Sequence, residues 1–142
     1  MKAQPSLRNI FDALNSTVYQ DEEKKPEHNP DLTRWAQQGI LLLNSSLTCQ
    51  IDKPGSHTPI WKDFIAYTVD MLNYTDNGLV FVLMGKQAQE LEGLIGDNHH
   101  IIKTSHPASA SYSKTTWDCQ DMFNRINSII EKTNGEQFKI KW

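Results

Sequence analysis

Three short apolar runs, separated by segments with helical spacing, constrain the fold of this sequence more than any other feature. The runs are ILLL at residues 40–43, LVFVLM at 79–84 and HHIIKT at 99–104. Strands that alternate with helices predict an α/β fold, in which helices pack on a sheet of parallel strands. The first run is too apolar for a half-exposed strand, so we expect both of its faces to be covered.

The segments around these runs have the pattern of amphipathic helices, with apolar residues at helical spacing and proline, asparagine or glycine near the ends. The sequence predicts a helix from Pro5-Ser6 to Val18, a short helix from Asn29-Pro30 through Trp35, a helix from Trp61 to near Asn77-Gly78, a helix from the Gly85 turn through Leu94, and a last helix marked by Met122, Phe123, Ile126, Ile129 and Ile130. Residues 19–30 and 46–59 have the composition of loops.

Polar or turn-forming residues follow each apolar run. Asn44 follows the first run, Gly85 the second, and His106 lies just beyond the third. Because ligands collect at the carboxyl ends of parallel strands, we expect these three residues to line one rim of the sheet. Small residues follow His106-Pro107, and we expect them to form a loop at the protein surface.

The length and composition exclude several classes of protein. A chain of 142 residues is expected to form one domain, spanning residues 1–142. Its 38% hydrophobic and 22% charged content is ordinary for a soluble globular protein. No apolar stretch is long enough to cross a membrane, and the N-terminus lacks the pattern of a signal peptide. The net charge of −3 argues against nucleic-acid binding through charge alone, but it allows a small phosphate site.

The cysteines and histidines indicate neither a disulfide framework nor a metal site. Cys49 and Cys119 are the two cysteines, and such isolated cysteines favour an intracellular, reducing location. No two of the five histidines have convincing metal-ligand spacing. We therefore expect no metal and no cofactor.

Five segments occur in an order that resembles one known family. WAQQGILLLNSSLT at 35–48 resembles the motif WAxQGVLLLNxxLTV, GLVFVLMGKQAQ at 78–89 resembles GVVFLLWGxxAQ, and HHIIKTSHPASAS at 99–111 resembles HHVLxxxHPSPLS. QPSLRNI at 4–10 resembles PPSLxNI, and the terminal IKW resembles IDW. On these motifs the chain is similar, over essentially its whole length, to the family 1 uracil-DNA glycosylases.

The resemblance implies a three-layer α/β/α sandwich with a short, mostly parallel sheet. It also implies hydrolysis of the N-glycosidic bond of deoxyuridine in DNA, a step of base excision repair. Asn44 matches the asparagine that reads the uracil edge, and His106 matches the histidine that acts on a uracil carbonyl oxygen. The positions that would contact DNA are Pro5, Ser6, Gly85, Lys86, Pro107, Ser109 and Ser111. The implied partner is uracil-containing DNA, and the implied oligomeric state is a monomer. The resemblance implies no metal, no cofactor and no association with a membrane.

The sequence also departs from that family. The motif GQDPYH, whose aspartate assists the attacking water, does not occur in these 142 residues, and neither does the segment with the phenylalanine that stacks on uracil. The resemblance therefore implies a family fold truncated at its N-terminus and lacking one central strand. Ala110 stands in place of the intercalating leucine and Ala108 in place of a phosphate-binding serine, so we expect weaker support for extrusion of the base.

Each candidate residue has a structural interpretation as well as a functional one. Asn44 is a common turn residue, His106 can be a satisfied group at a strand end, and Ser6 can be the N-cap of its helix. Two functions remain open. One is a glycosylase whose water-activating segment comes from elsewhere, and the other is a non-catalytic domain that docks to DNA or to a replication protein. A fragment that does not fold alone is a third possibility.

Overall fold

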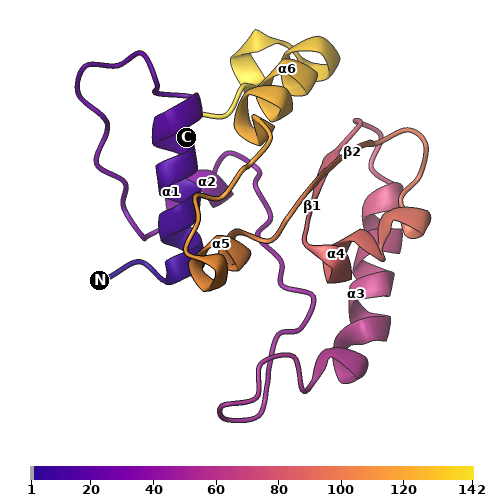
Figure 1. The fold of residues 1–142 in the computed structure, drawn as a ribbon. Coiled ribbons are helices and arrows are strands. Elements are labelled where there is room, and N and C mark those ends of the chain that lie inside the picture. Colours follow the sequence, from indigo (N-terminus) through magenta and orange to yellow (C-terminus); the bar gives the residue numbers. More distant parts are fainter. Residues whose placement is uncertain (1) are drawn as a thin grey trace.

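The computed structural model describes residues 2–142 and contains a two-stranded parallel sheet with helices around it (Figure 1). The helices are α1 (Pro5–Thr17), α2 (Thr33–Ala36), α3 (Thr58–Asn73), α4 (Lys86–Gln89), α5 (Pro107–Ser113) and α6 (Met122–Asn134), with short 3₁₀ helices η1 (Glu92–Leu94) and η2 (Glu136–Phe138). The strands are β1 (Val80–Met84) and β2 (His100–Thr104), paired from Val80 opposite His100 to Met84 opposite Thr104.

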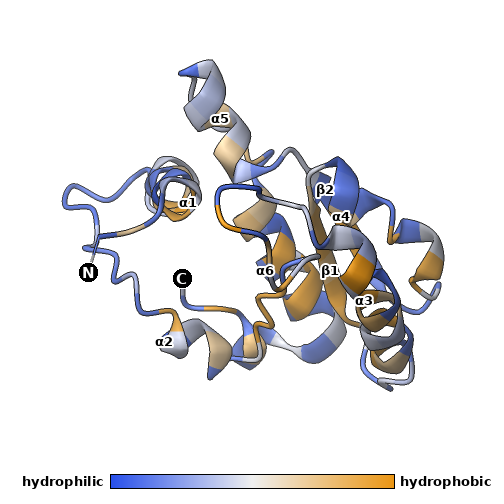
Figure 2. Cartoon of the chain, turned by 90° about the horizontal axis from the view of Figure 1, so that it is seen from below, coloured by the Kyte–Doolittle hydropathy of each residue, from blue (hydrophilic) through white to orange (hydrophobic). Residues whose placement is uncertain are grey.

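The sheet lies between two layers of helix, as the alternating pattern predicts. Figure 2 shows α6 on one side of the two strands and α3 on the other. The chain passes from β1 to β2 through α4 and η1, which is the kind of crossover that parallel strands require. Leu83 of β1 and Ile102 of β2 are only 4% and 1% exposed. The predicted α/β sandwich with a short parallel sheet is therefore confirmed.

A cluster of buried side chains, here called the closed core, joins α1, α2, α5 and α6 to the sheet. Leu14 is fully buried and Phe123 is 2% exposed. The ring of Trp142 packs edge-on against Trp35 and Phe123, with centroids 5.7 and 4.9 Å away. The cluster consists of Phe11, Ala13, Leu14, Trp35, Ile102, Ala110, Trp117, Cys119, Met122, Phe123 and Ile126. The predicted apolar faces of the first and last long helices thus meet in one core.

Two predicted helix starts differ from the structure. Gln4 is the N-cap of α1 and Ser6 lies inside its first turn, so the interpretation of Ser6 as the N-cap is wrong. Helix α2 begins at Thr33 rather than at Pro30. The carboxylate of Asp31 accepts hydrogen bonds from the Thr33 amide at 2.9 Å and from the Thr33 hydroxyl at 2.6 Å, which supports the later start.

The predicted helix after Gly85 is also shorter than expected. Helix α4 ends at Gln89, and the chain continues through η1 to Leu94. Gly93 lies within η1, and glycine in a helix interior lowers helical stability. Helix α3 likewise ends at Asn73, before the end that the sequence predicts near Asn77-Gly78.

Residues 40–43 do not form the buried strand that their composition predicts. They have no regular secondary structure, and Leu41, Leu42 and Leu43 are 63%, 53% and 40% exposed. Among residues 2–142, β1 and β2 pair only with each other, so no strand bonds to this segment. An apolar run is stable as a strand only where a neighbour satisfies its backbone N–H and C=O groups, and that neighbour is absent from the described chain.

The small residues after His106 form a helix rather than the predicted surface loop. Helix α5 spans Pro107–Ser113, and Pro107 occupies its first position, where no backbone N–H is needed. Ala110 is 3% exposed and belongs to the closed core. Figure 1 shows α5 beside the first turns of α1. The lack of bulk therefore allows the two helices to pack closely, and the interpretation of these residues as a surface loop is wrong.

Two smaller findings complete the description. No helix within residues 2–142 is both long enough and apolar enough to cross a membrane. Cys49 is exposed, Cys119 is buried, and both are free thiols.

Candidate functional site

His106 lies at the point where β2 gives way to α5, and its ring acts as the N-cap of that helix. The ring Nδ1 accepts a hydrogen bond from the Ala108 amide at 3.1 Å. A ring nitrogen that accepts a hydrogen bond carries no proton, so the proton of the neutral imidazole must lie on Nε2. The residue is exposed. The fold thus fixes the tautomer of His106 and leaves Nε2–H free to donate a hydrogen bond to a ligand.

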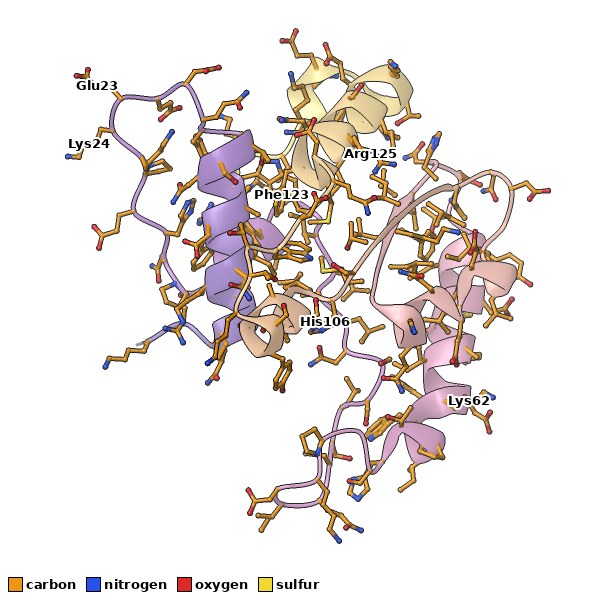
Figure 3. All side chains as sticks on the ribbon, in the orientation of Figure 1. Glu23, Lys24, Lys62, His106, Phe123 and Arg125 are labelled. Atoms are coloured by element: carbon orange, nitrogen blue, oxygen red, sulfur yellow. The ribbon has the colours of Figure 1, made fainter. Side chains whose placement is uncertain are left out.

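Gly85, which follows β1, lies directly against His106. Figure 3 shows His106 where the chain passes from β2 to α5. The Gly85 amide donates a hydrogen bond to the Thr104 carbonyl at 2.9 Å, which extends the pairing of the two strands by one residue. Gly85 has a φ of +88°, and a Cβ built on it would lie 3.1 Å from the His106 Cβ. Any larger residue would be strained at this φ, and its Cβ would press on the Cβ of His106. The glycine therefore sets the position of His106.

Asn44 lies in an exposed segment that is tied to the same end of the sheet. Its neighbour Ser45 donates a hydrogen bond from its hydroxyl to Gln87 Oε1 at 3.2 Å. Gln87 belongs to α4, which begins immediately after Gly85. The predicted rim is thus joined by two contacts, one between Ser45 and Gln87 and one between Gly85 and His106.

Asn9 holds α1 and α5 together next to this rim. Its side-chain amide donates hydrogen bonds to the Pro107 carbonyl at 2.7 Å and to the Ser111 hydroxyl oxygen at 2.9 Å. These bonds connect residues about a hundred positions apart in the sequence and align the N-terminal turns of both helices. Pro5 and Ser6 occupy the first turn of α1, and Lys86 is exposed at the start of α4.

The sequence pattern of the family described as "Uracil DNA glycosylase superfamily" matches residues 1–131 of this chain. The chain belongs to this superfamily. A uracil-DNA glycosylase from Alkaliphilus metalliredigens is 43% identical over 144 residues, covering 100% of this chain and 60% of that protein. The human uracil-DNA glycosylase is 36% identical over 131 residues, covering 91% of this chain and 41% of that protein.

Solved structures agree with this assignment. A mimivirus UNG variant in complex with UGI is similar with a TM-score of 0.81 and 27% identity, covering 100% of this chain and 57% of that one. The structure of mimivirus uracil-DNA glycosylase has a TM-score of 0.76 at 28% identity and covers 92% of this chain and 52% of that one. The chain spans 60% or less of the length of each of these relatives.

The two serines of α5 differ in what their hydroxyl groups can offer. Ser109 donates its proton to the His106 carbonyl at 2.6 Å, so it stabilises the first turn of the helix. Ser111 instead accepts from Asn9, which leaves its own proton free to donate. Asn9 was not singled out from the sequence, although the NI of QPSLRNI, which matches the glycosylase motif, contains it.

Tyr112 is an exposed aromatic residue that sequence reasoning missed. Ala110 matches the intercalating leucine of the glycosylase motif, but it is 3% exposed and packs in the closed core. Tyr112 lies two positions later on α5 and is 88% exposed. The large side chain that α5 presents to solvent is therefore Tyr112 and not residue 110. A search of the α5 sequence for aromatic residues would have found it.

The rim is open rather than enclosed. Two hollows of the surface are lined by residues 27–30 and by residues 46–49 with Pro54 and Gly55, and neither includes Asn44 or His106. Within residues 2–142, no cluster of three histidine, cysteine or acidic residues could hold a metal ion. The part of the site formed by these residues consists of hydrogen-bond donors and acceptors on an open edge of the sheet.

His28 lies away from this rim, and its surroundings lower its pKa. His28 stacks on Phe11 with ring centroids 4.8 Å apart and shares a hydrogen bond of 2.9 Å with Asn15 Oδ1. Burial lowers the pKa of His28, and the nearby positive charge of Arg34 lowers it further. His28 is therefore a half-buried residue that packs against α1, and its surroundings disfavour the charged form. His99 also makes a structural contact, since its Nδ1 accepts a hydrogen bond from the Leu79 amide at 3.0 Å.

Proposed function

We propose that this chain acts on uracil-containing DNA as a uracil-DNA glycosylase and hydrolyses the bond between uracil N1 and the deoxyribose C1′. The bonding electrons leave with the uracil ring, and water adds to C1′. Negative charge then develops on the uracil carbonyl oxygens, where a fixed hydrogen-bond donor stabilises it. The observation that carries the proposal is the exposed His106 side chain, whose Nδ1 accepts a hydrogen bond from the Ala108 amide, so that Nε2 is left to carry the proton.

Asn44 is the proposed selector of the base. A carboxamide places one acceptor and one donor side by side, which complements the carbonyl and N–H of uracil and mismatches the corresponding edge of cytosine. The side chain is exposed, and the bond between Ser45 and Gln87 anchors the segment that carries it. We therefore assign base recognition to Asn44 and leaving-group stabilisation to His106.

The DNA backbone would lie across the first turns of α1 and α5. Helix N-termini and hydroxyl groups bind phosphate oxygens, and Asn9 holds these two helices in register. Ser111 has a free hydroxyl proton for this purpose, whereas that of Ser109 is engaged. The proposed backbone contacts are those expected from the sequence at Pro5, Ser6, Gly85, Lys86, Pro107 and Ser111, with Ser109 positioning the turn.

Tyr112 is the proposed contact with neighbouring bases. An aromatic ring stacks on bases of any sequence, which suits a residue that supports an extruded nucleotide. Its exposure makes it available for such stacking, and the burial of Ala110 removes that residue from consideration. We expect a preference for single-stranded DNA, in which no paired base has to be displaced.

A uracil-release assay tests the proposal directly. The substrate is a single-stranded oligonucleotide with one deoxyuridine, and the comparison is between the 142-residue chain and its His106→Asn variant. Asparagine is a good N-cap, so this variant preserves the start of α5 while removing the Nε2–H donor. We expect the variant to lose roughly 100- to 1000-fold in rate, as enzymes do when one such donor is removed. Equal rates would remove His106 from the mechanism.

The second candidate function is a domain that binds uracil-containing DNA without cleaving it. These 142 residues do not contain the motif GQDPYH, and a domain that held uracil with Asn44 and His106 alone would bind the base without an aspartate of that motif to activate water. The same oligonucleotides separate the two functions. Tighter binding to deoxyuridine than to thymidine, with no uracil released by the wild-type chain, would support a binder and contradict the glycosylase proposal.

A further inference from the structure

Helix α4 connects the segment that carries Asn44 to the strand that leads to His106. It follows β1 directly (Figure 1) and contains two glutamines, Gln87 and Gln89, among its four residues. Successive helical residues are about 100° apart around the helix axis, so these two side chains leave α4 in nearly opposite directions. Each of them bonds to a different segment of the chain.

Gln89 fixes α4 to the end of β2. Its side-chain amide donates a hydrogen bond to the Thr104 carbonyl at 2.9 Å, and the Gly85 amide donates to the same carbonyl at 2.9 Å. A carbonyl oxygen has two lone pairs, and both are used here. Thr104 is 2% exposed and precedes His106 by two residues. The helix therefore has a fixed place beside the strand that leads to His106.

Gln87 extends from the other side of α4 to the segment of Asn44. Its Oε1 accepts a hydrogen bond from the Ser45 hydroxyl at 3.2 Å. Asn44 and Ser45 share a peptide unit, which is planar and rigid. Holding Ser45 therefore restrains the backbone from which the Asn44 carboxamide extends.

The same segment has a second anchor, four residues beyond Asn44. The Trp61 indole N–H, on α3, donates a hydrogen bond to the Thr48 hydroxyl oxygen at 2.8 Å. Ser46 donates its hydroxyl proton to the Thr48 carbonyl at 2.8 Å. This anchor holds the loop that follows Asn44, but several rotatable backbone bonds separate it from the carboxamide. The bond at Ser45 is therefore the contact that bears most directly on the orientation of Asn44.

We propose that Gln87 is a positioning residue that directs the Asn44 carboxamide toward uracil through Ser45. A carboxamide reads the uracil edge only when its donor and its acceptor both meet their partners, so a small rotation of the segment reduces recognition. Helix α4 supplies the fixed reference for Gln87, because its other side is bound to the end of β2. The inference rests on the proposed function of Asn44 and adds the residue that orients it.

The first test is the kinetics of uracil release from single-stranded DNA with one deoxyuridine. Gln87→Leu removes the acceptor, and it should lower kcat about three- to tenfold while KM stays within about twofold of the wild-type value. Gln87→Glu retains a side-chain oxygen and should restore kcat, which is the readout because the added charge repels DNA. Gln87 is exposed, so both variants are expected to fold, and thermal unfolding verifies this.

A matched control and a second background sharpen this test. Trp61→Phe removes a shorter hydrogen bond from the same segment and should lower kcat less than about twofold. Ser45→Ala should reproduce the loss of Gln87→Leu, since it removes the donor of the same bond. In an Asn44→Ala background, Gln87→Leu should have almost no further effect. Equal losses in both backgrounds would overturn the inference and leave the proposed glycosylase function intact.

NMR relaxation of the free chain tests the positioning without any reaction. The backbone order parameters of Asn44 and Ser45 should fall in Gln87→Leu toward the flexible range, below about 0.6, and should keep their wild-type values in Gln87→Glu. Unchanged order parameters in Gln87→Leu would overturn the inference whether or not the chain releases uracil.

A wild-type chain that releases no uracil would contradict the glycosylase proposal separately. The ratio of affinities for deoxyuridine and thymidine DNA then replaces kcat as the readout. Gln87→Leu should lower this ratio about three- to tenfold, and Gln87→Glu should restore it. A ratio that Gln87→Leu leaves unchanged would overturn the inference.

Discussion

The closed core and the leucine run at residues 41–43 hold similar residues in opposite environments. Leu14 in the closed core is fully buried, whereas Leu42 in the leucine run is 53% exposed. His106 is exposed but adjoins the closed core, because its ring caps α5 and Ala110 of that helix is part of the core. Asn44 adjoins the leucine run, because it directly follows Leu43. The chain by itself therefore fixes the proposed leaving-group stabiliser more firmly than the proposed base selector.

The proposed site is thus divided between two regions that the chain holds with different numbers of contacts. A catalytic donor must be held within a fraction of an ångström, and buried neighbours provide that precision. The Asn9 bonds and the close approach of Gly85 supply it for His106. For Asn44, the described residues supply one hydrogen bond at the neighbouring Ser45.

The largest expected effect is on the free energy of unfolding, when a leucine in each of the two regions is replaced by alanine. Leu14→Ala should lower the free energy of unfolding by about 3–5 kcal/mol, because it creates a cavity in the closed core. Leu42→Ala should change it by less than about 0.5 kcal/mol, as substitutions of exposed residues do. Urea denaturation of both variants gives these values. Similar losses for both would mean that residues 41–43 are buried in solution and that the comparison is wrong.

A second comparison removes the connection between α1 and α5. Asn9→Ala deletes two hydrogen bonds and should cost about 1–3 kcal/mol of unfolding free energy. Asn124→Ala is the control, since Asn124 bonds only locally to Asp121 on the exposed surface of α6. Its effect should stay within about 0.5 kcal/mol. Equal effects of the two substitutions would show that Asn9 does not hold the two helices together.

The capping role of His106 can be separated from its proposed chemistry. His106→Ala should cost about 1 kcal/mol of unfolding free energy, because the Ala108 amide loses its acceptor. His106→Asn should recover most of that loss, since asparagine also accepts from the amides of the first turn. Thermal unfolding measures both. A similar loss in the two variants would indicate that the ring contributes packing rather than a cap.

The smallest expected effect is a pH dependence that arises from His28. Burial lowers the pKa of His28 in the folded chain below its ordinary value. The unfolded chain then binds more protons between the two pKa values, so stability decreases as the pH falls below about 6.5. His28→Gln should reduce this slope in unfolding measured from pH 7.5 to 5. A slope unchanged by the substitution would exclude His28 as its cause.

Much of the fold follows from local patterns in the sequence. The periodic apolar residues of α1 and α6 and the β-branched runs of β1 and β2 specify their structures without help from distant residues. The run at 40–43 could not be placed in this way, because a strand depends on a neighbour that supplies hydrogen bonds. The same is true of α5, where the small residues that suggested a loop pack against α1.

The site was predictable to a similar extent. The rule that ligands gather at the carboxyl ends of parallel strands correctly places Gly85 beside His106. The roles of Asn44 and His106 remain predictions. Neither the tautomer of His106 nor the exposure of Tyr112 could be inferred, because both depend on how α5 sits on the core. The capping of the N-terminus of α5 by the His106 ring has no recognisable pattern in the local sequence.

The central claim is that Asn44 and His106 act on the same uracil, although they belong to differently stabilised regions. A double-mutant cycle of uracil release from single-stranded DNA, with Asn44→Ala, His106→Asn and the double variant, tests this claim directly. We predict that each single variant releases uracil at least about 100-fold more slowly than the wild-type chain. The rate of the double variant should be close to that of the slower single variant. Losses that multiply, or a wild-type rate in either single variant, would contradict it.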